Sequence, residues 1–141
     1  MSIQENYIEN LLSQKPYILG VSEKNDLFRK AMFRAFSFHF ENNSLFRNFC
    51  ENNDFKGDKI PERLEDYPYL PVNIFKKKNL ASVPQEQIQG VLNSSATSGV
   101  PSSISIDQIT SKRQSIVSAK IMSDYLGSHR RPFFILDSDP L

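Results

Sequence analysis

The segment from Asn93 to Ser103, NSSATSGVPSS, constrains the fold of this chain more than any other stretch. A strand pattern at 89–93 leads into it, and a second short strand pattern follows at 103–106. A helical pattern then extends from about Asp107 to Leu126, and Gly127 is a good helix stop. Strands that alternate with a helix predict an α/β domain in which segment 93–103 is a loop.

Residues 1–53 have a helical pattern that Pro16 interrupts. Ser22 is expected to cap a second helix. The residues on one, largely apolar face of this helix recur at steps of three and four. These residues are Phe28, Ala31, Met32, Ala35, Phe36 and His39. Because so many phenylalanines need several neighbours to bury them, we expect 1–53 to form a helical cap on a larger body.

Residues 54–71 contain several prolines and predict an extended connection from the cap to a sheet. Tyr67, Tyr69 and Leu70 give this connection apolar anchors, so we expect it to be ordered. The apolar residues of segment 72–75 then predict a short strand. Residues 72–141 are therefore expected to continue as strand, phosphate loop, strand, helix and strand.

Near the end of the chain, Pro132 precedes FFILD, an apolar run typical of a buried parallel strand that ends in Asp137. We therefore expect the start of a mixed or parallel sheet with a crossover helix. Such a strand needs cover on both faces, and a further crossover needs a dozen residues or more. The expectation is a truncated part of a longer N-terminal domain; the alternative is an edge strand covered by the N-terminal helices.

The charge and cysteine content exclude several classes of function. With 17 basic and 16 acidic side chains, the net charge of +1 provides no large field for nucleic acid or an anionic membrane. The single cysteine, Cys50, excludes an internal disulfide. Because there is no basic signal-like N-terminus and no long apolar run, we expect a cytoplasmic protein without a membrane span or a nucleic-acid partner.

The candidate site is the loop, in which Ser94, Ser95, Thr97, Ser98 and Gly99 place four hydroxyls and a glycine close together. Hydroxyls and exposed backbone N–H groups donate hydrogen bonds to anions, and small side chains let a phosphate approach. The loop has neither the GxxxxGK[ST] nor the GxGxxG pattern. A solvated turn between strands is the alternative interpretation.

Other residues with chemical potential are better explained structurally. Cys50 is expected to be a buried thiol, and His39 to be a core or boundary residue of its helix. His129, Arg130 and Arg131 could meet a phosphate or a carboxylate, but a solvated turn or a salt bridge explains them better. No catalytic residue and no metal ligand can be assigned from the sequence.

Four segments in one order carry a resemblance to a known family. They are YLPVNIFKK at 69–77, LASVPQEQI at 80–88, SSATSGVPS at 94–102 and RRPFFILD at 130–137. Together they resemble the N-terminal region of the acyl-protein synthetases of the LuxE family, within the acyl-adenylate-forming ligases. The resemblance covers residues 66–137, and the helical cap is compatible with it.

The resemblance implies a ligase that uses ATP and Mg²⁺ to convert a long-chain fatty acid into an acyl-adenylate. The acyl group then passes to a protein thiol, with an acyl-accepting or reductase protein as partner. In this family the loop is Ser-Ser-Gly-Thr-Thr-Gly followed by a proline, a serine and commonly a basic residue. Here Ala96 replaces a glycine, Ser98 a threonine and Ser103 the basic residue. The family's adenine contacts, hinge and acyl-accepting cysteine fall beyond residue 141, so the chain by itself is expected to be inactive.

Two alternatives remain open at this level. The chain could be a binding or assembly module without catalysis, with the aromatic helix at 27–40 docking a partner. It could also belong to a ligase for another carboxylate in a polysaccharide or secondary-metabolite pathway.

Overall fold

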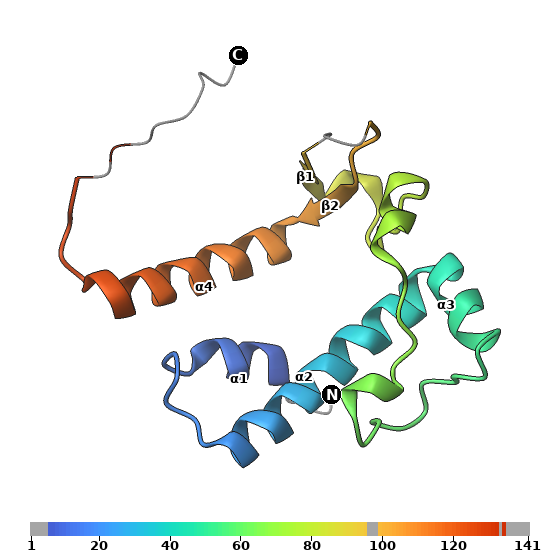
Figure 1. Ribbon diagram of the computed structural model, residues 1–141, viewed down its shortest axis with the longest axis horizontal. Helices are drawn as coiled ribbons and strands as arrows, with labels where there is room; N and C mark the ends of the chain where they lie inside the picture. Colours follow the sequence, from blue (N-terminus) through green and yellow to red (C-terminus); the bar gives the residue numbers. More distant parts are fainter. Residues whose placement is uncertain (1–5, 96–98, 133, 135–141) are drawn as a thin grey trace.

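The computed structural model describes residues 6–95, 99–132 and 134 (Figure 1). Its regular elements, in chain order, are the helices α1 (Tyr7–Ser13), α2 (Val21–Asn42) and α3 (Ser44–Glu51), the strands β1 (Ile88–Asn93) and β2 (Ser103–Asp107), and the helix α4 (Gln108–Leu126). Three short 3-10 helices lie between α3 and β1, at Leu64–Asp66, Val72–Lys76 and Gln85–Gln87. The chain is therefore a mixed α/β structure.

The core of the helical cap is built around the ring of Phe36 on α2, which is only 6% exposed. Four other rings lie with their centroids 5.0–5.6 Å from that of Phe36. They belong to Phe40, Phe46, Phe55 and Tyr67. These rings come from α2, from α3 and from the connection, so one side chain joins three segments, as the excess of phenylalanines predicted.

The connection is ordered because it packs on this core. Tyr67 contacts both Phe36 and Phe55, which confirms it as an anchor, whereas Tyr69 is 83% exposed and is not one. Gly57 has a φ of +66°, and a Cβ at this position would lie 2.8 Å from Cε1 of Phe36. Glycine is therefore required where the connection passes over the ring.

The helical cap differs from the sequence prediction at two points. The second helix begins at Val21 after Gly20, so Ser22 is not its cap. The helical segment also breaks at Asn43, whose side chain accepts a hydrogen bond from the N–H of Phe46 at 2.9 Å and so caps α3. Asparagine is a favoured N-cap residue, and this signal in the sequence was missed.

Strands β1 and β2 form an antiparallel pair in which Asn93 lies opposite Ser103 and Val91 opposite Ser105. Both predicted strands and the following helix are confirmed, including Gly127, with a φ of +77°, at the C-cap of α4. Within the described residues this pair is the whole sheet, and it is antiparallel. The short loop explains the antiparallel pairing, because a parallel connection needs a dozen or more residues. The predicted parallel strand near the end of the chain lies, except for Phe134, outside the described residues.

The strand predicted at 72–75 is wrong, because this segment is a 3-10 helix at Val72–Lys76. Pro71 precedes it with a φ of −62°, and the carbonyl of Pro71 accepts the N–H of Ile74 at 3.0 Å. Proline favours the start of a helical turn. Hydrogen bonds within the segment therefore satisfy its backbone groups, and within the described structure the segment is not a member of the two-stranded sheet.

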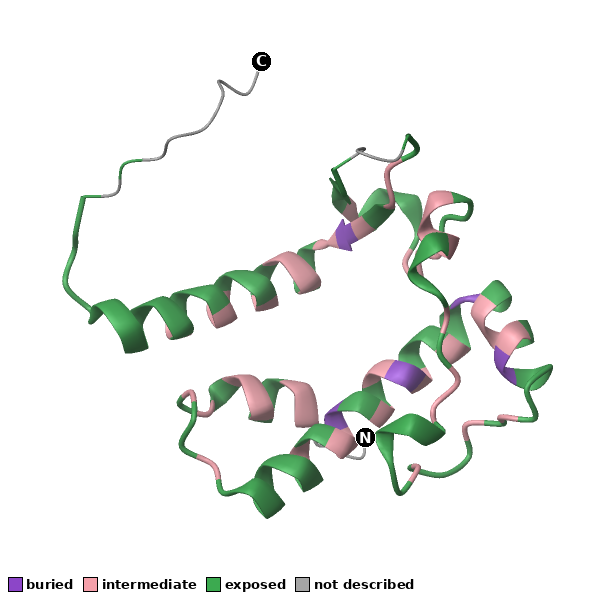
Figure 2. Cartoon of the chain, viewed as in Figure 1, coloured by how far each residue is buried: buried purple, intermediate pink, exposed green. Residues whose placement is uncertain are grey.

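Helix α4 lies along α1 and is tied to it mainly by polar side chains (Figure 1). Arg113 contacts Glu9 at 2.8 Å, and the ammonium group of Lys120 donates to the carbonyls of Leu12 and Gln14 at the end of α1. Figure 2 shows that most of α4 is nevertheless exposed. The helix therefore rests on the cap along one side.

The predicted strand in FFILD lies outside the described residues, except for Phe134, which is 90% exposed and not in a strand. Asp137 is also outside them. Within the described part of the chain, no helix has the length and apolar character that crossing a bilayer requires.

We expect replacement of Phe36 by alanine to lower the free energy of unfolding by roughly 3–5 kcal/mol, as for other buried phenylalanines. Urea denaturation followed by circular dichroism measures this loss. Phe28, on the same helix but 40% exposed, is the matched control, and its replacement by alanine is expected to cost much less. Equal losses for the two variants would contradict the central role of Phe36.

Candidate functional site

The loop from Ser94 to Ser102 closes the β1–β2 hairpin, and its two ends are hydrogen-bonded to each other. The N–H of Ser94 donates to the carbonyl of Ser102 at 3.0 Å, and the N–H of Ser102 donates to the hydroxyl oxygen of Ser94 at 2.9 Å. Since a serine hydroxyl has one proton besides its two acceptor sites, the O–H of Ser94 can still donate. The base of the loop is thereby fixed.

The described residues above this base face solvent. Ser95 and Gly99 are exposed, and Gly99 has a φ of +101° in open space, where an added Cβ would meet no atom within 4 Å. A positive φ is the conformation that glycine adopts at little cost. The other predicted site residues, Thr97 and Ser98, and the substituted position Ala96 lie outside the described residues.

Ser103, which stands where the family commonly has a basic residue, has a structural partner here. Its hydroxyl donates to Oδ1 of Asn93 at 2.8 Å, across the last pair of the hairpin. The hydroxyl proton of Ser103 is thus used within the hairpin. Of the two serines, Ser94 is the better donor for an anion.

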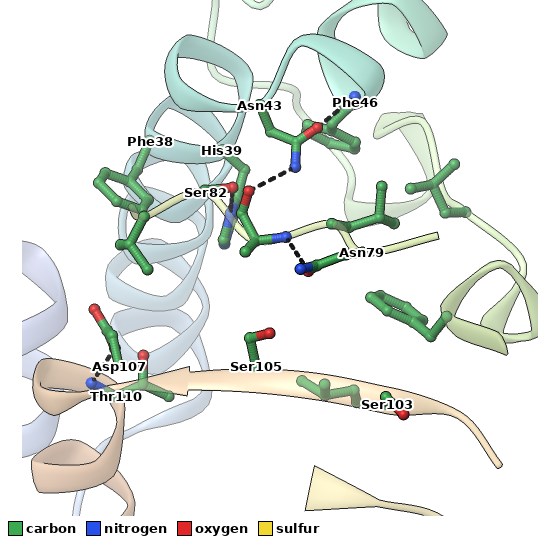
Figure 3. A pocket seen from close by; sticks show the side chains of 16 residues that line it. Phe38, His39, Asn43, Phe46, Asn79, Ser82, Ser103, Ser105, Asp107 and Thr110 are labelled. Carbon is green, nitrogen blue, oxygen red and sulfur yellow. Dashed lines mark hydrogen bonds between the residues drawn. The ribbon is translucent and has the colours of Figure 1, made fainter. Parts of the chain in front are cut away.

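A pocket of about 360 Å³ lies beside the hairpin, between β2, the end of α2 and segment 79–83 (Figure 3). Its walls are largely apolar and include Phe38, Phe46 and Leu80. Ser103, Ser105 and Asp107, at alternate positions of β2, also line it. The strand that leaves the loop is therefore also a wall of the pocket.

His39 and Ser82 form a hydrogen-bonded pair at the pocket, with Nδ1 of His39 2.7 Å from Oγ of Ser82. Burial lowers the pKa of His39, and the negative charge of Asp107 partly opposes this effect. The imidazole is therefore mainly neutral at neutral pH and offers one donor and one acceptor nitrogen. Although its ring is partly desolvated at the cavity, the His39 residue as a whole is exposed, so the prediction of a core or boundary residue is not confirmed.

Asp107 caps α4, because its Oδ1 accepts the N–H of Thr110 at 2.8 Å. Hydrogen bonding from Thr110 holds the pKa of Asp107 below its ordinary value. The carboxylate is therefore ionised at neutral pH. Figure 3 shows it at the same end of the pocket as Thr110, with Ser103 towards the other end.

The pocket includes polar residues that the sequence interpretation did not identify as a site, namely Asn43, Ser82, Asp107 and Thr110. Asn43 is 7% exposed, and its amide donates to the carbonyl of Ala81 at 3.1 Å. The sequence signals at these positions were capping signals, an asparagine before α3 and an aspartate before α4. These signals locate helix ends and do not show that the ends meet.

The other residues that the sequence singled out belong neither to the hairpin loop nor to the pocket. Cys50 is 0% exposed, as predicted, and burial raises the pKa of its thiol. His129, Arg130 and Arg131 are exposed beyond the far end of α4. Because α4 has 19 residues, about 28 Å of helix separates them from the hairpin.

Comparison with known proteins places these features in context. The family model described as acyl-protein synthetase, LuxE, matches residues 2–141. The chain is 30% identical over 98 residues to a long-chain-fatty-acid–luciferin-component ligase of Vibrio harveyi, a match that covers 70% of this chain and 25% of the relative. The ligase of the same name from Aliivibrio fischeri is 31% identical over 112 residues, covering 79% of this chain and 29% of the relative.

A third relative of that name, from Photorhabdus luminescens, is 25% identical over 99 residues, covering 70% of this chain and 84% of the relative. The chain thus spans a quarter to three tenths of the first two relatives. No solved structure is significantly similar to it.

We expect replacement of Asp107 by asparagine to lower the pKa of His39 further, because the charge that raises this pKa is removed. Asparagine is also a good N-cap, so α4 should be retained. An NMR titration of the His39 ring protons measures the change. Replacement of the exposed Asp124 by asparagine is the control, and an unchanged His39 pKa in the Asp107 variant would contradict the coupling.

Proposed function

Because the chain belongs to the LuxE family of acyl-protein synthetases, we propose that it supplies the phosphate-binding part of an ATP-dependent ligase for long-chain fatty acids. The observation that carries this proposal is the match of the family model to residues 2–141. A hydroxyl-rich loop sequence stands at the place of the family motif, and its described residues Ser94, Ser95 and Gly99 are exposed. The relatives from Vibrio harveyi and Aliivibrio fischeri are both named as long-chain-fatty-acid ligases, which supports the substrate class.

In the proposed reaction, a carboxylate oxygen of the fatty acid attacks the α-phosphorus of ATP. The new bond forms as the bond to the bridging oxygen of pyrophosphate breaks, and negative charge grows on the leaving oxygens. Donors fixed near the phosphates stabilise this charge most when they need not reorganise during the reaction. This requirement suits a loop with a fixed base and donors at its exposed positions.

Ser94 is the best-defined donor of this loop. Its oxygen already accepts the N–H of Ser102, which restricts the rotation of the hydroxyl and leaves its proton for a phosphate oxygen. Ser95 and Gly99 lie beside it on exposed backbone, and Thr97 and Ser98 complete the proposed set. The role of the set is to hold the triphosphate in line with the attacking carboxylate.

Mg²⁺ is proposed only as the ion that accompanies the phosphates of ATP. Among the described residues, no three His, Cys, Asp or Glu side chains are grouped to hold a metal. Protein sites for Mg²⁺ commonly use one or two carboxylates and the substrate phosphates. We therefore assign no step through the metal to residues of this chain.

The acyl group is proposed to pass from the adenylate to a protein thiol outside these residues. Cys50 is unsuited to this role, since it is fully buried and burial raises the pKa of its thiol. The acceptor, and any reductase partner that takes the acyl group further, is thus expected beyond the described structure.

A non-catalytic assembly module remains the alternative from another class. Such a module would need an exposed aromatic surface on the helix at 27–40, but Phe36 and Ala31 of this helix are buried inside the cap. Phe28, Met32 and Phe38 keep 38–40% exposure. The exposed apolar surface of this helix is therefore smaller than the sequence predicted. This difference favours the ligase over the assembly module.

We expect a chimera, in which residues 2–141 replace the matching segment of the Aliivibrio fischeri relative, to exchange labelled pyrophosphate into ATP only when a fatty acid is present. Adenylate formation is reversible, so labelled pyrophosphate can react with the acyl-adenylate and appear in ATP. The unmodified relative is assayed alongside. Absence of exchange across fatty-acid chain lengths, in a chimera that is folded, would argue against the ligase; exchange with other carboxylates would instead change its substrate class.

In the same chimera, replacement of Ala96 by glycine is expected to tighten ATP binding by about fivefold. A residue with a Cβ costs about 1 kcal/mol more than glycine at positive φ, and the family has glycine at this place. Isothermal titration calorimetry measures the affinity. The control replaces the exposed Ala119 of α4 by glycine, and an equal change in both variants would contradict a specific role of the loop.

A further inference from the structure

The pocket beside β2 has largely apolar walls and a few polar groups. The phosphate binding proposed for the loop involves neither. The apolar walls come from three separate segments, represented by Phe38, Leu70 and Phe75. Its polar groups include the His39–Ser82 pair, on the α2 side, and the carboxylate of Asp107, across the pocket at the end of β2 (Figure 3). The region between these groups is called the polar end. A concave apolar site with a few convergent polar groups is typical of a small-molecule site.

The charge at the polar end restricts what can bind. Asp107 is ionised, whereas the imidazole of His39 is neutral, so this end carries one negative charge. The N–H of Thr110 occupies Oδ1 of Asp107 at 2.8 Å. The side chain of Thr110 also hydrogen-bonds this carboxylate, and the remaining lone pairs of its oxygens are acceptor sites. An apolar group placed against them would remove water from a charge without replacing the hydrogen bond.

We propose that this pocket binds a molecule with an apolar body and a terminal hydrogen-bond donor, either a hydroxyl or an ammonium group, and that it rejects carboxylates. The donor hydrogen-bonds the carboxylate of Asp107, and the His39–Ser82 pair provides a second polar contact. A carboxylate would meet the like charge of Asp107 at close range and would leave both groups without compensation.

This site goes beyond the proposed ATP chemistry and does not depend on it. It also restricts how a substrate could use the shared strand, because a fatty acid cannot enter the polar end with its carboxylate first. The carboxylate would remain outside that end, and a substrate with a hydroxyl or an amine far from its carboxylate would fit the pocket best.

Three probes with the same alkyl chain, n-hexanol, n-hexylamine and n-hexanoate, test the proposal without ATP. Each is titrated into the ¹⁵N-labelled 141-residue chain, and the amide shifts of Ser82, Ser105 and Asp107 are followed. Saturable shifts are expected with hexanol or hexylamine or both, which distinguishes the hydroxyl from the ammonium group as the preferred donor. No shift with either, or hexanoate binding as tightly as the better of the two, would overturn the proposal.

The Asp107→Asn variant gives the sharper result, because it retains a helix cap while removing the charge. Hexylamine binding is expected to weaken roughly tenfold, the effect of losing a charge-assisted hydrogen bond, and hexanoate is expected to gain affinity. The Asp124→Asn control should leave all three affinities unchanged. If Asp107→Asn unfolds, Ser82→Ala serves instead, and unchanged hexanol binding in this variant would count against the site.

Discussion

The burial of Phe36 is the interaction on which the rest of this structure depends. Full burial of a phenylalanine side chain contributes roughly 1.5–3 kcal/mol, and favourable ring pairs add about 0.5–1.5 kcal/mol. Phe36 makes such contacts with rings from α2, α3 and the connection. It also requires glycine at position 57, where a Cβ would lie 2.8 Å from the ring. Together with the hydrogen bonds from the Arg29 guanidinium to the carbonyl of Pro61, this ring fixes the path of the connection over the cap.

Polar contacts at the end of α2 then position the residues that follow the connection. Asn43 caps α3 with one side-chain atom and holds the carbonyl of Ala81 with the other. One helical turn earlier, His39 is paired with Ser82. These two contacts hold segment 79–83 above the end of α2. The pocket exists because this segment and β2 face each other across it.

Strand β2 joins the two features that have chemical potential. Its first residue closes the hydroxyl-rich loop through the Ser103–Asn93 hydrogen bond, and its last, Asp107, caps α4 at the polar end of the pocket. Neither feature is formed by one element alone. A substitution on this strand therefore acts on the loop, on the pocket or on the start of α4, according to its position.

Local signals in the sequence determined the elements whose hydrogen bonds close within a few residues. The strands around the loop, helix α4 with its Gly127 stop, and the buried Cys50 are confirmed, and the order of motifs indicated the family. The hydroxyl-rich loop was also evident, although its role in binding phosphate stays a prediction. The strand at 72–75 failed because apolar residues alone do not supply a pairing partner. Only the tertiary structure decided that His39, Ser82 and Asp107 meet at one pocket. Their positions in the chain are far apart, and the contacts of Asn43 with Ala81 and of His39 with Ser82 that hold segment 79–83 at the end of α2 are long-range in sequence.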